Sequence, residues 1–309
     1  ENGTVSYRIE GDLTVHENIA DDTLLYVSGD AVVQAEGDMY IKEGTVKGDA
    51  YLTSGKDLSI KGLEVHGELD AAAAGDVDVK DTKVSGDAVI ISGGNITADG
   101  LTPDGRLAMD AERSIDAVFN EKLDGAEIYA QAGEDISLEF KEKTDADITL
   151  DAGGNADLFF DKDADVRTDV TAGEEFGIIT GGALKLTDKK TDDETFIIDS
   201  LLSEKDDPVT VVSGRDIEIR HTNAEKLKAD MAEDKELSVS AVNSIEISFI
   251  NEKGILGDTG VYGDLTVNGK SLKVTGDVRT AGKAEFTAED ILNIIGRITA
   301  DRLVFNGMK

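Results

Sequence analysis

A glycine recurs with a 19-residue period in the first third of the chain, and this spacing constrains the fold more than any other feature. The glycines in register are Gly29, Gly48, Gly67, Gly86 and Gly105. Glycine supplies 33 of the 309 residues, so composition alone does not explain a run of this regularity. A fixed period of this length is typical of stacked units, each of which buries its apolar face against its neighbours.

The residues between the glycines repeat as well. Apolar side chains lie two and four positions after each glycine, as at Ala88 and Ile90, and a small residue such as Ser92 follows. An Asp, Asn or Ser comes next, as at Asn95, and a second alternating apolar pair begins at Ile96. Alternation at period two predicts short strands with one buried face. A third short strand ends in valine, at Val46, Val65 and Val84.

Two other repeat architectures do not fit this unit. A propeller blade needs roughly 40 residues or more, and a leucine-rich repeat would carry a fixed Leu and Asn pattern that is absent. The remaining solution is a coil of short strands in which each turn stacks in parallel on the one before. We therefore predict an all-β, right-handed parallel β-helix (a β-solenoid) with about 19 residues and three short strands per rung.

The pattern continues along the chain with small insertions. An irregular rung is predicted from Leu184, Leu186, Phe196 and Ile198 around a polar loop at 187–194. Loop insertions are also predicted near 221–236, which we expect to be solvated loop rather than helix, and near 249–262. With about 16 rungs stacked at roughly 4.8 Å, residues 1–309 would form a single elongated domain roughly 75 Å long. Residues 1–28 follow the pattern less well, as expected of an atypical terminal rung.

The repeat also predicts the role of each small column. We expect the glycines to supply the backbone conformations that turns need. We expect the Ala and Ser column, which includes Ser92, to mark a tight corner. The Asp column is predicted to cap turns.

The charge balance excludes several classes of function. The chain has 65 Asp and Glu against 31 Lys and Arg, a formal net charge of −34. Such a charge argues against nucleic-acid binding and against docking on anionic lipid. No apolar stretch approaches the roughly 18 residues of a membrane span, so we expect no membrane insertion. The chain contains no Cys, so disulfides and thiolate sites are excluded.

No motif in the sequence assembles a recognisable reactive site. Gly93-Gly94-Asn95 and Gly153-Gly154-Asn155 are isolated and do not continue as calcium-binding nonapeptides. His16, His66 and His221 are far apart in sequence and are predicted to be surface residues. No nucleophile elbow, Walker loop or dinucleotide fingerprint occurs. We therefore predict no catalytic, cofactor-binding or metal residues, while weak cation binding by stacked carboxylates stays open.

The unit resembles the shaft repeats of filamentous-haemagglutinin-type exoproteins, the large bacterial surface adhesins of two-partner secretion. The resemblance rests on G-D-A-V-I-I-S-G-G-N-I at 86–96 and its counterparts at 48–60 and 67–79, and it extends over 29–180 and 209–295. It implies a secreted or cell-surface adhesin. The family's N-terminal secretion domain, with its Asn-Pro-Asn motifs, has no counterpart here, and no signal peptide is visible in the sequence. We therefore expect a shaft segment or a relative exported by another route.

These observations predict an extracellular or cell-surface structural and adhesive protein rather than an enzyme. The rigid solenoid would act as a shaft, and the predicted insertions would contact receptors or glycans on host cells or neighbouring bacteria. Two alternatives remain open. One is a filament subunit that self-associates through its solenoid ends, and the other is a carbohydrate-active β-helix enzyme with paired carboxylates.

Overall fold

The structure is a computed structural model, and it describes residues 5–11, 13–16, 23–192, 194–204, 207–232 and 234–307. Strands and turns make up these residues, and no helix occurs among them. The fold is a parallel β-solenoid of about 15 turns with about 19 residues per turn, which confirms the predicted fold class. The chain divides into two compact units. The prediction of a single elongated domain over 1–309 stays a prediction.

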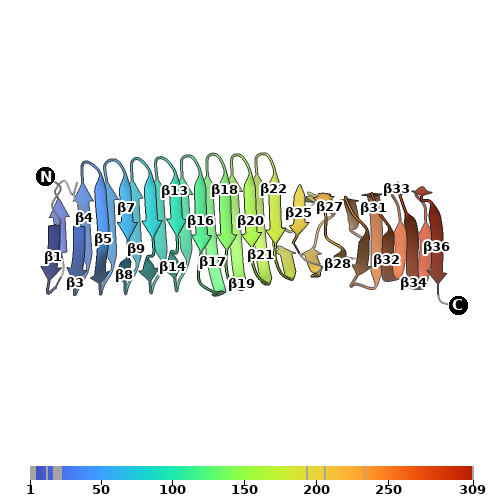
Figure 1. The fold of residues 1–309 in the computed structure, drawn as a ribbon, viewed down its shortest axis with the longest axis horizontal. Helices are drawn as coiled ribbons and strands as arrows, with labels where there is room; N and C mark the ends of the chain where they lie inside the picture. The colour runs from blue at the N-terminus through green and yellow to red at the C-terminus, as the bar shows by residue number, and fades with distance from the viewer. Residues whose placement is uncertain are drawn as a thin grey trace. The chain divides into compact units, whose positions relative to one another are not determined.

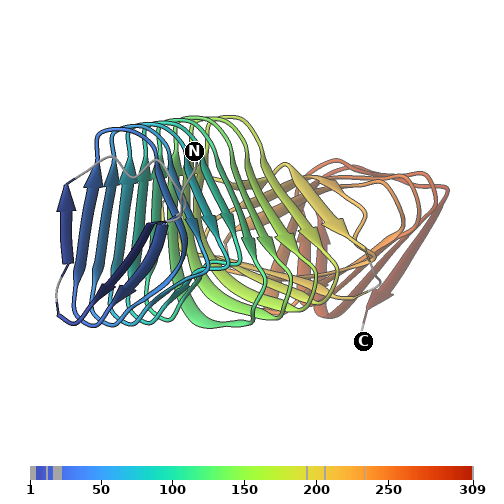
Figure 2. The same ribbon diagram turned by 60° about the vertical axis from the view of Figure 1, so that its left-hand side comes forward.

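Unit 1 contains residues 1–157 and 170–174. Its strands lie side by side from turn to turn, as the blue and green ribbons show in both views (Figures 1 and 2). The first strands of successive turns are β2 (Leu13–His16), β4 (Ala31–Ala35), β6 (Ala50–Ser54), β9 (Leu69–Ala73), β12 (Ala88–Ser92) and β15 (Leu107–Ala111). The second strands are β5 (Met39–Val46), β7 (Leu58–Lys61), β10 (Val77–Lys80), β13 (Ile96–Asp99), β16 (Ile115–Phe119) and β18 (Ile136–Phe140). Short third strands are β1 (Val5–Ile9), β3 (Thr23–Val27), β8 (Leu63–Val65), β11 (Lys83–Val84) and β14 (Thr102–Pro103).

In unit 1, the residues that were predicted to stack in columns are register partners in neighbouring strands. Ala50 pairs with Leu69, and Leu69 pairs with Ala88, so partners follow the 19-residue period of the sequence. In the later turns the third strand merges with the first strand of the next turn, which gives the long strands β17 (Leu123–Ala132) and β19 (Thr144–Ala152). The terminal strand β2 pairs with β4 from Leu13 to Ala31, so the part of 1–28 that is described follows the same stacking.

The core of unit 1 consists of stacked aliphatic columns. Val33, Leu52, Ala71, Ile90 and Met109 continue one another from turn to turn, and each is at most 1% exposed. Burying a side chain of this size contributes roughly 1.5–3 kcal/mol, so these columns supply most of the stabilisation.

The predicted turn caps are confirmed, and each one joins two turns. The Asp57 Oδ1 accepts the backbone N–H of Asp76 at 2.9 Å, and the Asp76 Oδ1 accepts the N–H of Asn95 at 2.7 Å. The corresponding bonds in unit 2 include Asp216 to Glu236 and Asp264 to Lys283. A backbone donor that would otherwise face solvent at the corner is thereby satisfied within the stack.

The repeat glycines serve a different purpose from the one predicted. Among the described residues, positive φ angles occur at Gly11, Gly62, Gly100, Gly125 and Asp81, so the glycines in the 19-residue register do not need left-handed backbone. A Cβ on Gly67 would instead lie 2.1 Å from the Asp49 Oδ1. Gly48, Gly67 and Gly105 therefore make room for the capping carboxylate of the preceding turn, whereas a Cβ on Gly86 would meet the Gly67 carbonyl oxygen at 2.8 Å.

The Ala and Ser column lies at a corner, as predicted. Ser54 and Ser92 are buried at the ends of β6 and β12. The Ser92 Oγ lies 2.7 Å from the Gly75 carbonyl oxygen, and it accepts the Gly94 N–H at 3.0 Å. Where serine is present, its hydroxyl therefore satisfies the backbone of the turn that follows.

Unit 2 contains residues 158–169 and 175–309. β20 (Ala156–Phe160) and β21 (Ala164–Ala172) contribute residues to both units. The strands that follow are β22 (Phe176–Thr180), β23 (Leu184–Asp188), β24 (Phe196–Ile198), β25 (Ser200–Ser203), β26 (Val209–Ser213), β27 (Ile217–Thr222), β28 (Lys226–Met231) and β29 (Glu236–Ala241). The last strands are β30 (Ile245–Phe249), β31 (Lys253–Val261), β32 (Leu265–Val274), β33 (Val278–Thr280), β34 (Lys283–Ile294), β35 (Ile298–Thr299) and β36 (Arg302–Gly307).

The irregular rung in unit 2 is confirmed, whereas two predicted loop insertions are wrong. Leu184, Leu186, Phe196 and Ile198 are buried in β23 and β24, and residues 189–195 join these strands, with Asp193 outside the described residues. The predicted loop at 221–236 contains strand β28, and the one at 249–262 contains strand β31. Buried residues alternate along β28 and, with one break at Leu256 and Gly257, along β31, so both segments are strands of the solenoid.

Candidate functional site

The structure does not bring the histidines together. His66 lies in the turn after β8, with its Nε2 3.4 Å from the Glu64 Oε1, while His16 ends β2 and His221 lies in β27. Within the described part of the chain, no group of three His, Asp or Glu side chains lies close enough together to hold a metal ion. Asn95 and Asn155, from the two Gly-Gly-Asn segments, belong to the ladder of turn caps instead.

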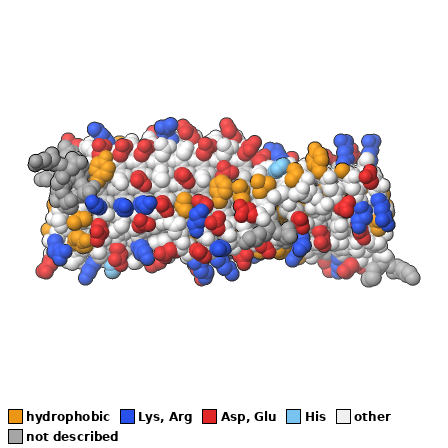
Figure 3. All heavy atoms as spheres, viewed as in Figure 1, with side chains coloured by type: hydrophobic (Ala, Val, Ile, Leu, Met, Phe, Trp, Pro, Cys, Tyr) orange, Lys and Arg blue, Asp and Glu red, His pale blue; other side chains and the backbone are white. Residues whose placement is uncertain are grey.

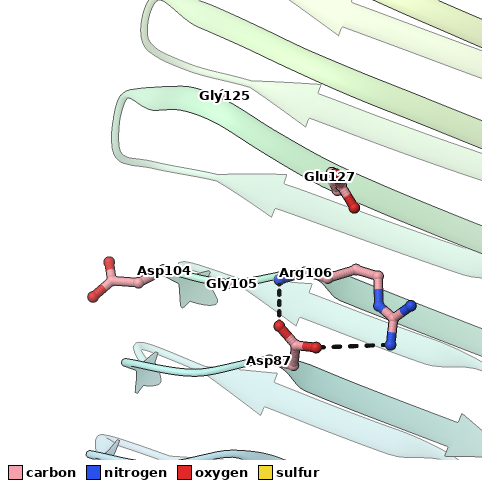
Figure 4. Close-up of a pocket in the computed structure, with 6 residues that line it drawn as sticks. All are labelled: Asp87, Asp104, Gly105, Arg106, Gly125 and Glu127. Carbon is pink, nitrogen blue, oxygen red and sulfur yellow. Dashed lines mark hydrogen bonds and ion pairs between the residues drawn. The ribbon is translucent and has the colours of Figure 1, made fainter.

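A shallow pocket of about 430 Å³ opens where the 19-residue register changes in unit 1 (Figure 4). β17 pairs with β15 from Ile128 to Leu107, a spacing two positions longer than in the preceding turns, and Gly125 near its start has a φ of +72°. The pairing of β17 with β19 shifts register at Gly125, so the extra residues form an irregularity in the strand beside the pocket. The lining residues are Asp87, Asp104, Gly105, Arg106, Gly125 and Glu127.

The pocket holds one guanidinium among three carboxylates. The Asp87 Oδ1 accepts the Arg106 backbone N–H at 2.8 Å, and its Oδ2 lies 3.7 Å from the Arg106 Nη2 (Figure 4). Arg106 stands one turn after Asp87, at the position where a carboxylate would cap the next turn. The series of capping carboxylates in this column therefore ends at Asp87. The Arg106 side chain is 57% exposed, so the pocket is open to solvent. The alternative of a carbohydrate-active enzyme is nevertheless best tested here, at Asp104 and Glu127.

A buried ion pair holds the 189–195 loop of unit 2. Arg215 binds Asp188 through two bonds, from Nε to Oδ2 at 2.8 Å and from Nη2 to Oδ1 at 2.9 Å. Their side chains are only 5% and 1% exposed. The Arg215 Nη1 also donates to the Asp192 Oδ1 at 2.8 Å, and this bond holds the pKa of Asp192 below its ordinary value of 3.8. The five donors of a guanidinium suit this forked arrangement, which is a structural clamp for the loop.

One sheet face of unit 1 is poor in charge. It is formed by the outward side chains of β4, β6, β9, β12, β15 and β17, and we call it the first-strand face. Its two columns are Val32, Tyr51, Asp70, Val89, Ala108 and Tyr129, and Gln34, Thr53, Ala72, Ile91, Asp110 and Gln131. Tyr51, Ile91 and Tyr129 are 40%, 45% and 38% exposed. Asp and Glu side chains are scattered widely elsewhere, as on the side drawn in Figure 3.

The sequence predictions found the columns but not these surfaces. The outward positions of the first-strand face vary from turn to turn, so they carry no repeat signal of their own. The chain matches no known family model, no curated protein and no solved structure.

Proposed function

We propose that this protein is a secreted or cell-surface structural and adhesive protein of a bacterium, in which the β-solenoid serves as a rigid shaft. The observation that supports this most is the ladder of bonds between turns. Backbone partners, buried columns and capping carboxylates all link each turn to the next, as from Asp57 to Asp76. Such a stack resists bending and local opening, which suits a spacer between a cell and its target.

The attachment surfaces belong to this proposal too. Because β28 and β31 are strands of the solenoid, the 189–195 loop is the one predicted insertion that remains a loop among the described residues. Sheet faces are therefore the largest surfaces that a shaft can offer to receptors or glycans on other cells. The described residues contain no helix long and apolar enough to cross a membrane.

Immunolabelling of intact source cells tests the proposal. Antibodies against the purified protein should label unpermeabilised cells or the culture medium. Cells that carry a deletion of the gene provide the control, and beads coated with the protein should adhere to target cells more than beads coated with albumin. Label that appears only after permeabilisation would overturn the proposal.

A second candidate function is a self-associating filament subunit, and it can be tested at the last described turn of unit 2. Leu303 and Phe305 are 44% and 47% exposed, yet they continue the columns of Ala284 and Phe286, which are fully buried. Another β turn can cover such a face by continuing the ladder. Sedimentation velocity over a wide concentration range tests this candidate. Concentration-dependent assembly that is lost in Leu303→Ser/Phe305→Ser supports it, and a constant monomer mass contradicts it.

A further inference from the structure

The first-strand face differs in charge from the neighbouring sheet face of the same turns. Asp70 and Asp110 are the only charged residues in its two columns. On the outward side of the second strands, by contrast, Lys61 pairs in register with Lys80, and Asp78 lies two residues before Lys80. In a chain that is 31% charged, a face with so few charges is a local departure from the average.

Apolar side chains gather on this face. Tyr51, Ile91 and Tyr129 are exposed, and Val89, Ala108 and Ala72 between them are half-buried. Val89 and Ala108 are adjacent in register, and Ala72 pairs with Ile91 in the other column. Tyr51 and Tyr129 lie at the two ends of this group, four register steps apart, which corresponds to about 19 Å at the usual strand spacing. Asp70 separates Tyr51 from Val89 in register. Single exposed apolar residues are ordinary, but apolar side chains gathered on a face that is poor in charge and bordered by polar groups are typical of an interaction surface.

Polar groups accompany each tyrosine of the group. The Tyr129 Oη donates to the Gln131 Oε1 at 2.7 Å, which fixes the ring beside an amide. Asp70 is the register partner of Tyr51, and Asp110 is the register partner of Gln131. Tyrosine offers a flat apolar ring with a polar tip, while carboxylates and amides accept and donate hydrogen bonds. Rings that stack on C–H faces, flanked by groups that bind hydroxyls, suit a sugar chain.

The negative charge of the chain indicates which kind of molecule can bind this face. Two copies of the chain each carry a formal charge of −34 and repel when they lie side by side, and an anionic polymer is repelled in the same way. A neutral polymer has no such penalty. We propose that the first-strand face binds a neutral, linear polysaccharide along the stack of turns, with Tyr51 and Tyr129 as stacking platforms. This inference rests on the proposed function.

Affinity electrophoresis in gels that contain a polysaccharide tests this inference. The probes are galactomannan, mannan and hydroxyethyl cellulose, with alginate as the anionic comparison. We expect retardation by at least one neutral polymer and none by alginate. Tyr51→Ala/Tyr129→Ala should weaken binding roughly 5- to 150-fold, the fold-change that corresponds to losing the stacking of two aromatic rings. Tyr40→Ala is the matched control, because Tyr40 is 41% exposed on a second strand, and it should bind like the wild type.

Three results would overturn the inference. The first is an absence of retardation by every neutral polymer. The second is equal binding by the double tyrosine variant when its circular dichroism and melting temperature match the wild type. The third is a dimer in sedimentation velocity that the double variant loses, because the occupant would then be a second copy. Surface labelling of cells is independent of these results, so failure here leaves the proposed function standing.

Discussion

At the scale of single residues, the turns depend on an Asp and a Gly that face each other across consecutive turns. The Asp264 Oδ1 accepts the Lys283 N–H at 2.7 Å, and a Cβ on Gly282 would lie 2.1 Å from the same oxygen. The sequence predicts both columns from their spacing. The reason for the glycine could not be predicted, because it lies in a contact between turns rather than in the local backbone.

Gly282→Ala should therefore destabilise unit 2 by about 1–3 kcal/mol, the usual penalty of forcing an extra methyl group into a filled site. Chemical denaturation followed by circular dichroism measures the change. Gly260→Ala is the control, since a Cβ there meets nothing within 4 Å, and it should stay within about 0.5 kcal/mol of the wild type. If Asp264→Ala does not relieve part of the Gly282→Ala penalty, the proposed steric conflict is wrong.

Asp81 is the one described non-glycine residue with a positive φ, at +48°. It occupies the same corner as Gly62 and Gly100, whose φ angles are +62° and +74°. Asp81→Gly should leave stability unchanged or raise it by up to about 1 kcal/mol, and Asp81→Val should lower it by about 1–2 kcal/mol, because a branched side chain disfavours the left-handed region. Equal melting temperatures for the two variants would show that this corner is not strained.

At the scale of elements, strand β28 shows how the repeat can be missed. Leu227, Ala229 and Met231 alternate with polar residues and are buried, so the period-two signal is present in the sequence. The spacing conceals this signal, because Leu227 is 18 residues from its partner Val209 and 20 residues from its partner Ile247, whereas the regular period is 19. No Gly-Asp turn marks the strand either. The strands were predicted correctly where the 19-residue spacing is constant, and they were missed where the spacing changes.

Hydrogen exchange distinguishes a strand from a loop in this segment. We expect the amides of 227–229 to exchange as slowly as those of β26 and β30, because these residues pair with both neighbouring strands. Leu227→Asp should destabilise unit 2, since it buries an unpaired charge. Exchange of 227–229 at the rate of an exposed loop would support the original loop prediction and contradict the structure.

The Arg215 clamp is a second element that the repeat pattern did not reveal, because its partners come from an irregular rung. Arg215→Ala leaves Asp188 buried without its partner, and we expect a loss of about 3–5 kcal/mol in unit 2 together with faster exchange at 189–195. Arg220→Ala is the control, since Arg220 is 49% exposed beside Asp199 and should cost less than about 1 kcal/mol. Comparable losses in both variants would argue against a special role for the clamp.

At the scale of the whole molecule, the acidic composition is compatible with a stable fold because nearly all described charges lie at the surface, and the buried Asp188 is paired with Arg215. The 39% of apolar residues fill narrow columns, and the acids cap turns or face solvent. Composition and period together predicted the solenoid and the length of its turns. The division into two units and the location of the binding surfaces could not be predicted, because both depend on outward positions and irregular turns that do not repeat.

The central claim, a parallel stack in 19-residue register, can be measured directly with spin labels. The chain has no Cys, so cysteine pairs label only the chosen sites. Thr53 is paired in turn with Ala72, Ile91, Asp110 and Gln131, which lie successively further along one column. The account predicts that the distance between the labels rises by about 4.8 Å with each turn. Distances that do not rise in sequence order, or that scatter broadly, would contradict it.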